Sequence, residues 1–373
     1  MKIITVGGAT QDIFFSYEGA DIMTIDKKGA LQSFMLFESG EKVEIDSIQY
    51  YTGGGATNTA ASFKRLGLEA GCFCSIGNDA AGQAITTALT NEGVDIGLVT
   101  TNPHHSTGIS AIINTIRGDR TIFAYRGANA HLIPNPKLFD ELKTTQLLYI
   151  TSLSKQSATM LPELVLVARK NKVSVAINPG TSQLAHDTQN LKKSLTHIDT
   201  LILNSSEART FMTALVQTDE EYKSSLKSST EKHPCSLNEP NRDPYLMQYP
   251  LCNKSYYFSM PKFFKEVLKM GPSIVVVTNG ANGVYVATPS AVYFHPSIKV
   301  NVMSAVGAGD AFGSCFTASL QLGYSIPDAL RNGVVNSASV LEHIGAKEGL
   351  LTHENLKARV RAIPSTLLQS MPL

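Results

Sequence analysis

The hydrophobic and polar positions follow two rhythms along the chain. Between residues 13 and 50, apolar residues recur in places at a period near two, which predicts short antiparallel strands that are half exposed. Residues 109–114 and 120–125 flank a short polar run and are typical of a β-hairpin. From residue 146 onward, strand patterns alternate with helix patterns. Such alternation predicts an α/β fold, with a mostly parallel central sheet flanked by helices.

The alternation predicts particular elements. Strands are expected at 3–6, 70–76, 147–150, 173–177, 201–203 and 273–278. Helices are expected at 57–65, 79–92, 158–171, 182–195, 310–322 and 328–343. Residues 217–260 break the rhythm, because they are rich in Ser, Lys, Glu, Asn and Pro and have little periodicity. This composition predicts an insertion or a long surface loop.

Composition narrows the possible functions. The 32 basic and 31 acidic residues give a net charge of +1, which excludes a broad electrostatic surface for nucleic acid or for an anionic membrane. No apolar stretch reaches the roughly 18–20 residues of a membrane-spanning helix. The five cysteines form no CxxC pair, so a zinc scaffold is not expected. We expect a protein of the reducing cytoplasm that binds neither nucleic acid nor membranes.

The most informative motif is a glycine-rich turn before the predicted helix at 310–322. Gly307 and Gly309 would let backbone N–H groups approach an anion at the positive end of the helix dipole. Asp310 follows in the first helical turn. Its carboxylate could cap the helix, or it could accept a proton from an attacking hydroxyl while the helix end holds a phosphoryl group. From this motif alone both interpretations stay open.

Two further places could carry chemistry. Gly53, Gly54 and Gly55 precede a small-residue helix, which again allows close backbone approach or a packed turn. Asp12 comes just after the first strand, where open α/β sheets place ligands, although a turn residue would look the same.

Asn204 and Glu207 follow the predicted strand at 201–203. Their i, i+3 spacing puts both side chains on one face of a helical turn. A capping box would have a similar pattern. The common nucleotide fingerprints are absent, because Phe312 stands where the third glycine of G-x-G-x-x-G belongs and no Walker P-loop occurs.

Together the motifs resemble the signatures of the PfkB (ribokinase-like) carbohydrate kinases. The resemblance covers most of the chain outside 217–260 and about the last dozen residues. The matching motifs, in family order, are Gly53-Gly54-Gly55-Ala56-Thr57-Asn58 with Gly77-Asn78-Asp79-Ala80-Ala81-Gly82, Asn204 to Glu207 (N-x-x-E), Thr278-Asn279-Gly280-Ala281-Asn282-Gly283 (T-x-G-x-x-G), and Gly307-Ala308-Gly309-Asp310-Ala311-Phe312.

The resemblance implies a fold and an activity. We expect one ribokinase-like domain over 1–373, with a small β lid formed by strands in 13–50 and 107–126 that could pair two subunits into a homodimer. The implied activity is transfer of the γ-phosphoryl group of ATP, with Mg²⁺, to a hydroxyl of a sugar. The alternatives are a nucleoside kinase of the same fold and a catalytically weak regulatory relative.

The resemblance also assigns roles to residues. Asp310 looks like the general base, and the anion hole would be Gly307, Ala308 and Gly309. The implied acceptor-binding residues are Asp12, Gly54, Gly55, Asn58 and Arg126. The implied nucleotide-binding residues are Asn204, Glu207, Thr278, Gly280, Gly283 and Asn336, with Glu207 also supporting Mg²⁺ indirectly.

Two positions depart from the family pattern. Ser304-Ala305-Val306 stands where the family usually has D-T-x, so the carboxylate that supports a monovalent-cation loop is missing. Activation by potassium is therefore doubtful. Ribokinases carry Lys in the first signature where this chain has Gly55, which makes ribose a weaker expectation as substrate.

Overall fold

A large sheet of nine strands lies at the centre of the part of the chain that the structure describes. The computed structural model describes residues 1–17, 21–27, 30–40, 42–114, 120–224, 244–248, 251–253 and 256–373. The strand order is β19-β18-β17-β16-β13-β12-β11-β1-β6. The strands from β6 to β16 run parallel, and β17, β18 and β19 are antiparallel. The α/β fold class predicted from the alternation is confirmed.

The strands of this sheet come from both ends of the chain. They are β1 (Lys2–Val6), β6 (Glu69–Phe73), β11 (Leu147–Ile150), β12 (Ser174–Ile177), β13 (Thr200–Asn204), β16 (Ile274–Thr278), β17 (Val284–Ala287), β18 (Ala291–His295) and β19 (Gln369–Pro372). The short strands β7 (Ser75–Gly77) and β8 (Thr100–Asn102) pair separately. The predicted strand at 70–76 is therefore two strands, because β7 leaves the large sheet to pair with β8.

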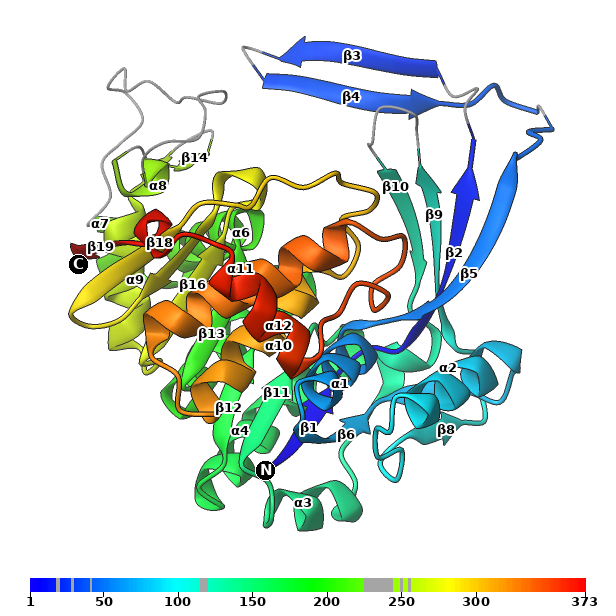
Figure 1. The fold of residues 1–373 in the computed structure, drawn as a ribbon, viewed down its shortest axis with the longest axis horizontal. Helices are drawn as coiled ribbons and strands as arrows, with labels where there is room; N and C mark the ends of the chain where they lie inside the picture. The colour runs from blue at the N-terminus through cyan, green and yellow to red at the C-terminus, as the bar shows by residue number, and fades with distance from the viewer. Residues whose placement is uncertain are drawn as a thin grey trace.

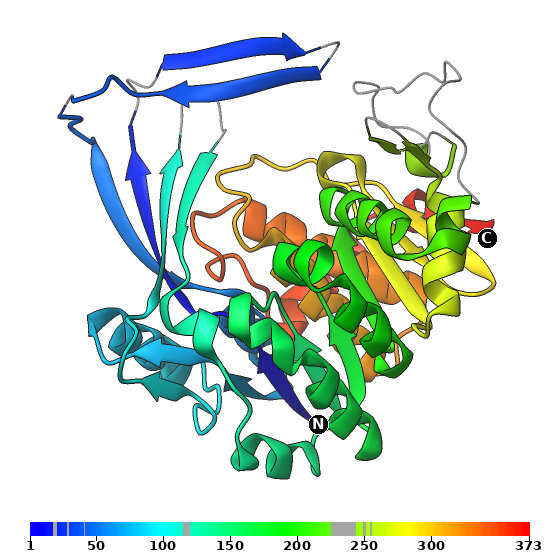
Figure 2. The same cartoon turned by 180° about the vertical axis from the view of Figure 1, so that it is seen from behind.

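Helices cover both faces of the large sheet (Figures 1 and 2). Successive strand residues point to opposite faces, so Ile4 and Val6 join the core under one helical layer while Ile3 joins the core under the other. The first layer holds α4 (Leu161–Lys170), α5 (Thr188–Ser194), α6 (Ser205–Thr218) and α9 (Met260–Lys269). The second layer holds α1 (Gly55–Arg65), α10 (Ala308–Gln321), α11 (Ile326–Leu341) and α12 (His353–Arg361). No helix in the described residues is both long enough and apolar enough to cross a membrane.

Four strands form a second, smaller sheet, which we call the small sheet. Its order is β10-β9-β2-β5, and its strands are β2 (Thr10–Ser16), β5 (Ser47–Gly53), β9 (Gly108–Asn114) and β10 (Arg120–Tyr125). It stands away from the large sheet in Figure 1, and the hairpin of β3 (Asp21–Lys27) and β4 (Ala30–Leu36) lies across its far end. The turn predicted between β9 and β10 lies outside the described residues.

Packing decides which face of the small sheet is buried. The register places Asp12 opposite Tyr51 and Ser110, and Phe14 opposite Ile112, so these side chains share one face. Asp12, Phe14 and Ile112 are buried. The other face carries exposed apolar side chains, namely Ile48, Tyr50, Phe123 and Tyr125.

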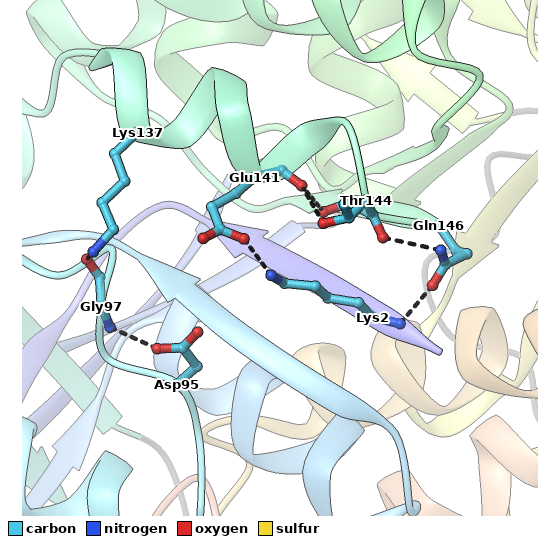
Figure 3. Close-up of polar contacts among 8 residues, drawn as sticks. Lys2, Asp95, Gly97, Lys137, Glu141, Thr144 and Gln146 are labelled. Atoms are coloured by element: carbon cyan, nitrogen blue, oxygen red, sulfur yellow. Dashed lines mark hydrogen bonds and ion pairs between the residues drawn. The ribbon is translucent and has the colours of Figure 1, made fainter.

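Polar contacts tie the start of β1 to the helix at 136–142 and to the turn after it (Figure 3). The Lys2 ammonium pairs with Glu141 in α3 (Pro136–Leu142), and the Lys2 backbone N–H donates to Gln146 Oε1 at 2.6 Å. Lys137 Nζ donates to the Gly97 carbonyl at 2.6 Å. Asn135 caps α3 through a hydrogen bond from Leu138 N. These contacts hold α3, and α2 (Ala80–Asn91) is capped in the same way by Asp79.

The segment at 217–260 is partly a core element. Its described residues form the end of α6, α7 (Glu220–Ser224), α8 (Tyr245–Gln248), β14 (Leu251–Asn253) and β15 (Tyr256–Phe258). Leu246, Leu251 and Phe258 are buried in the main hydrophobic core. Residues 225–243 lie outside the described residues. The described part therefore contributes to the core, and the insertion or long surface loop expected over 217–260 stays a prediction.

Candidate active site

The amino-terminal end of α10 is shaped by glycines. Gly307 is the N-cap residue, with φ +80°, and a Cβ there would lie 2.6 Å from Ala346 Cα, so a larger residue is excluded. A Cβ on Gly309 would meet no atom within 4 Å. The first backbone N–H groups of a helix have no partner within the helix. This helix end can therefore receive an anion.

Asp310 lies half-buried in the first turn of α10. Its Oδ2 accepts a hydrogen bond from Asn58 Nδ2 at 2.8 Å, so the carboxylate reaches across to α1. Burial raises the pKa of Asp310, the Asn58 hydrogen bond opposes this, and the negative charge of Asp12 adds to it. A carboxylate with a raised pKa is better matched to accept a proton near neutral pH.

Asp12 lies inside β2 of the small sheet, beyond the strand end at which it was expected. It is buried and accepts a hydrogen bond from Thr10 Oγ1 at 2.9 Å. Burial raises the pKa of Asp12, while hydrogen bonds from Thr10 and Ser110 and the charge of Lys347 oppose the rise. The Cα of Gly53 packs so closely against the Asp12 carboxylate that a Cβ would overlap it.

The first glycine cluster forms the start of α1. Gly54 is the N-cap residue with φ +97°, and a Cβ there would lie 2.5 Å from the Gly8 carbonyl oxygen. Gly55 is the first residue of the helix and packs against Thr151. Asn58, one turn later, is buried, and its Oδ1 has no hydrogen-bond partner among the described residues. A buried acceptor without a partner indicates a place for a ligand donor.

Asn204 and Glu207 form the capping box that their spacing allowed. Asn204 Oδ1 accepts from Glu207 N, and Asn204 N donates to Glu207 Oε2, both at 2.8 Å. Asn178 Nδ2 also donates to Glu207 Oε2, at 3.3 Å. Burial raises the pKa of Glu207, with a further contribution from Asp310. The sequence pattern did not point to Asn178.

A cavity of about 780 Å³ opens beside the end of α10. Among its lining residues are Asn204, Thr278, Gly280, Gly283, Ala308 and Gly309, which the sequence motifs had singled out. Apolar side chains, including Ile298, Val300 and Val334, form much of the remaining wall. The helix end and the T-x-G-x-x-G turn therefore share one cavity.

Two expected site residues do not line this cavity. Asn336 does not line this cavity, because it is buried and its amide bonds the Ala311 carbonyl and Leu351 N. Its neighbour Ser337 lines the cavity instead. Arg126 is exposed next to the short 3-10 helix η1 (Gly127–His131), and its side chain makes no hydrogen bond or ion pair with another described residue.

Lys347 escaped the sequence analysis. It is 6% exposed, and its Nζ donates to Thr52 Oγ1 at 2.6 Å. A single lysine after Gly345 and Ala346 carries no motif, so nothing in the sequence marked it.

Among the described residues, no group of three or more His, Cys, Asp and Glu side chains could hold a metal ion.

The comparison with known families agrees with this geometry. The model of the pfkB family carbohydrate kinases matches residues 20–235 and 261–353. This chain belongs to that family. It is therefore an enzyme, a phosphotransferase that acts on an alcohol group, and the family implies ATP as the donor. The resemblance inferred from the four motifs is confirmed.

Curated relatives of the chain are sugar kinases. A ribokinase of Haemophilus influenzae is 24% identical over 318 residues, which cover 84% of this chain and 89% of the relative. A 5-dehydro-2-deoxygluconokinase of Shouchella clausii is 26% identical over 331 residues, covering 85% and 88%.

Solved structures share the fold. Arabidopsis thaliana ribokinase, complexed with ribose and ATP, has a TM-score of 0.72 at 18% identity and covers 96% of this chain and 98% of its own. The Methanocaldococcus jannaschii nucleoside kinase has a TM-score of 0.67 at 19% identity, covering 97% and 98%. The ribokinase-like fold is thus shared by kinases with different acceptors.

Proposed function

We propose that this enzyme transfers the γ-phosphoryl group of ATP to a hydroxyl of a sugar. The observation that carries the proposal is the Asp310 carboxylate, which lies in the first turn of α10, is bonded to Asn58, and is close enough to Asp12 for the two charges to interact. The proton acceptor thus lies at the helix end that lines the cavity, and a second carboxylate lies within electrostatic reach of it.

Asp310 is the proposed general base. Asn58 holds Oδ2, which leaves Oδ1 free to face an acceptor hydroxyl. As the hydroxyl oxygen bonds to the γ-phosphorus, the bond from that phosphorus to the bridging oxygen of ATP breaks, ADP leaves, and the hydroxyl proton passes to Asp310. The raised pKa of Asp310 supports this role, because a base is most effective when its pKa approaches the working pH.

The α10 end is the proposed anion hole, formed by Gly307, Ala308 and Gly309. The open space at Gly309 supports close approach of phosphate oxygens to backbone N–H groups. These donors would stabilise the negative charge that spreads over the transferring group. Bound ATP would supply the phosphoryl group there, and Mg²⁺ would neutralise charge on its phosphates.

The cavity residues Thr278, Gly280 and Gly283 would contact the nucleotide. Asn204 lines the same cavity, and its capping box fixes Glu207. Glu207 Oε2 is occupied by two hydrogen bonds, so Oε1 is the atom that would accept from a metal-bound water. An indirect metal role suits a site where no cluster of protein ligands is present among the described residues.

The acceptor would lie between the small sheet and α1. Asp12 can accept hydrogen bonds from two hydroxyls at once, and the unpartnered Asn58 Oδ1 can accept from a third. Gly54 and Gly55 would let the acceptor approach the start of α1. Arg126, an exposed residue directly before η1, stays a proposed acceptor contact, whereas Asn336 is bonded within the protein and is left out of the nucleotide site.

The proposed enzyme is one domain, in which the strands of 13–50 and 107–126 act as a lid that excludes water from the transferring group. The exposed apolar face of the small sheet pairs with a second copy in a homodimer. Potassium contributes little, because Ser304 is a neutral residue whose Oγ already accepts from Val306 N.

An acceptor panel tests the proposal. The enzyme, with Mg²⁺ and ATP, is offered sugars, sugar acids and nucleosides, and phosphorylated products are identified by mass spectrometry. We expect a sugar or sugar derivative to give the highest kcat/KM. A nucleoside as the preferred acceptor would replace the sugar assignment, and ATP binding without any acceptor turnover would indicate a regulatory relative.

A further inference from the structure

The turn at residues 345–348 lies between β5 of the small sheet and the amino-terminal end of α10, where the phosphate is proposed to bind. Ala346 packs against Gly307, the N-cap residue of α10. Gly345 lies against the Tyr51 ring of β5, and Lys347 Nζ donates to Thr52 Oγ1 in the same strand. One short turn thus contacts both halves of the proposed site.

Lys347 is an unusual residue for such a turn because its charge is buried. An ammonium has three donors, and among the described residues this one has a single hydrogen-bond partner and no ion pair. Its backbone is fixed on both sides, since Lys347 N donates to Glu348 Oε2 and the Lys347 carbonyl accepts from Arg65 at 2.8 Å. Keeping a buried ammonium in this position costs stability, which indicates a role beyond packing.

Lys347 is bonded to β5, the strand that pairs with the Asp12 strand, β2. The register pairs Asp12 with Tyr51, so Thr52 points to the opposite face of the strand. The next residue, Gly53, packs directly against the Asp12 carboxylate. A shift of the Thr52 end of β5 would therefore move Gly53, whose backbone packs against the Asp12 carboxylate.

We propose that Lys347 is a positioning residue of the acceptor site, which fixes the Thr52–Gly53 end of β5 behind the Asp12 carboxylate. The inference rests on the proposed function in that it takes Asp12 as the acceptor-binding carboxylate. Lys347 need not touch the acceptor. It acts through the strand, and its positive charge also favours the ionised form of Asp12.

The charges around Lys347 support this arrangement. Burial lowers the pKa of Lys347, and Glu348, Asp12, Glu92 and Cys72 oppose the effect, in that order. Glu92 is already paired with Arg65. On the Asp12 side, Thr10, Ser110 and Lys347 favour the carboxylate, while Glu348 disfavours it. Removing Lys347 should therefore raise the pKa of Asp12.

Kinetics of matched variants provide the first test. Lys347→Met removes the charge and the donor but keeps the length of the side chain. We expect the acceptor KM to rise by about tenfold, equivalent to about 1.4 kcal/mol, while the ATP KM stays within about twofold. The acid limb of the acceptor 1/KM profile should move to higher pH. Lys347→Arg should restore both, and the exposed Lys143→Met is the control.

Thr52→Val separates the two contributions. It removes the Thr52 hydroxyl that accepts from Lys347 Nζ but leaves the Lys347 charge. The KM for the phosphoryl acceptor should therefore rise without a shift of its pH profile. Equal changes in the KM of acceptor and ATP for Lys347→Met, or an unchanged acceptor KM, would overturn the proposal.

A double-mutant cycle keeps the test independent of catalysis. The free energy of unfolding is measured for wild type, Lys347→Met, Asp12→Asn and the double variant at neutral pH. A favourable coupling between the two side chains is expected, and additivity would overturn the proposal. If wild type phosphorylates no acceptor, the proposed function fails while this cycle still decides the role of Lys347.

Discussion

Asp310 is held in a place where its charge is unfavourable. Burial and the Asp12 charge raise its pKa, whereas the Asn58 hydrogen bond and the positive end of the α10 dipole favour the carboxylate. A side chain under such conditions is typical of catalytic sites, where stability is given up for chemistry. Asn58, at the start of α1, and Asp310, at the start of α10, meet although 252 positions separate them in sequence.

Replacing Asp310 by Asn should therefore stabilise the fold at neutral pH, by about 1 kcal/mol. The pKa of Asp310 is higher in the folded than in the unfolded chain, so the folded state binds the proton more tightly. Stability contributed at this position falls as the pH rises through the window between the two pKa values. Asn does not titrate, and its advantage should vanish as the pH falls below that window.

Urea denaturation between about pH 3 and pH 8 measures this effect, since the lower end of the window is the pKa of about 3.9 of Asp in an unfolded chain. The exposed Asp140→Asn serves as the control and should change the free energy of unfolding by less than about 0.5 kcal/mol. An Asp310→Asn variant that is less stable than wild type at pH 7 would show that the carboxylate is a structural cap.

The end of α10 is the element on which the proposed phosphate binding depends. Gly309→Ala introduces a methyl group into open space and a better helix former, so the fold should keep its stability or gain up to about 1 kcal/mol. The same methyl group would obstruct a phosphate that approaches the backbone. We expect kcat/KM for ATP to fall by about 10²-fold. Thermal denaturation with steady-state kinetics checks both, and an unaffected kcat/KM would move the anion hole elsewhere.

Elements in the segment at 217–260 support the core. Phe258 is fully buried next to β14, so Phe258→Ala should lower the free energy of unfolding by about 3–5 kcal/mol. The kcat of the folded fraction should stay close to that of wild type, because Phe258 is not among the described residues that line the cavity. The exposed Leu166→Ala in α4 is the control. A loss below about 1 kcal/mol would mean that this part is peripheral after all.

The sequence predicted strands and site motifs better than it predicted irregular helices. The strand at 147–150 was correct to the residue, since its apolar run is buried on both faces. The helix expected at 158–171 begins only at Leu161, after a 3-10 turn, with Pro162 in its first turn. α9 and α12 were not anticipated. α9 directly follows the aperiodic segment 217–260, which hid its start. Its apolar face includes Phe263 and Phe264.

Site residues on glycine turns could be found from sequence because their spacing is local. Gly307 and Gly54 need a left-handed backbone conformation, and each stands directly before a helix. Contacts between distant segments could not be found in this way. Neither the Lys347 bond to Thr52 nor the Asn178 bond to Glu207 leaves a spacing signal, and Asn336 was assigned to the site although its amide bonds to the protein interior.

One face of the small sheet carries exposed apolar side chains. Tyr50 is 60% exposed and Phe123 is 58% exposed, and the register puts both on the face opposite Asp12. Such a face is typical of an interaction surface. The proposed homodimer would cover it and would stiffen the strand that carries Asp12.

Substituting both Tyr50 and Phe123 by Lys should convert the dimer into a monomer. Sedimentation velocity measures the change, and the acceptor KM should rise more than the ATP KM. Leu166→Lys, on an exposed position of α4, is the control and should leave the dimer intact. A wild-type monomer at micromolar concentration would contradict the pairing.

The account as a whole depends on Asp310 as the proton acceptor of a phosphoryl transfer. The most direct measurement is transfer of labelled γ-phosphate from ATP to the best acceptor, for wild type and Asp310→Asn, with ATP binding measured by calorimetry on the same samples. We predict that kcat falls by about 10²- to 10⁴-fold while the Kd for ATP stays within about threefold. An Asp310→Asn enzyme that keeps kcat within about tenfold of wild type would contradict the account.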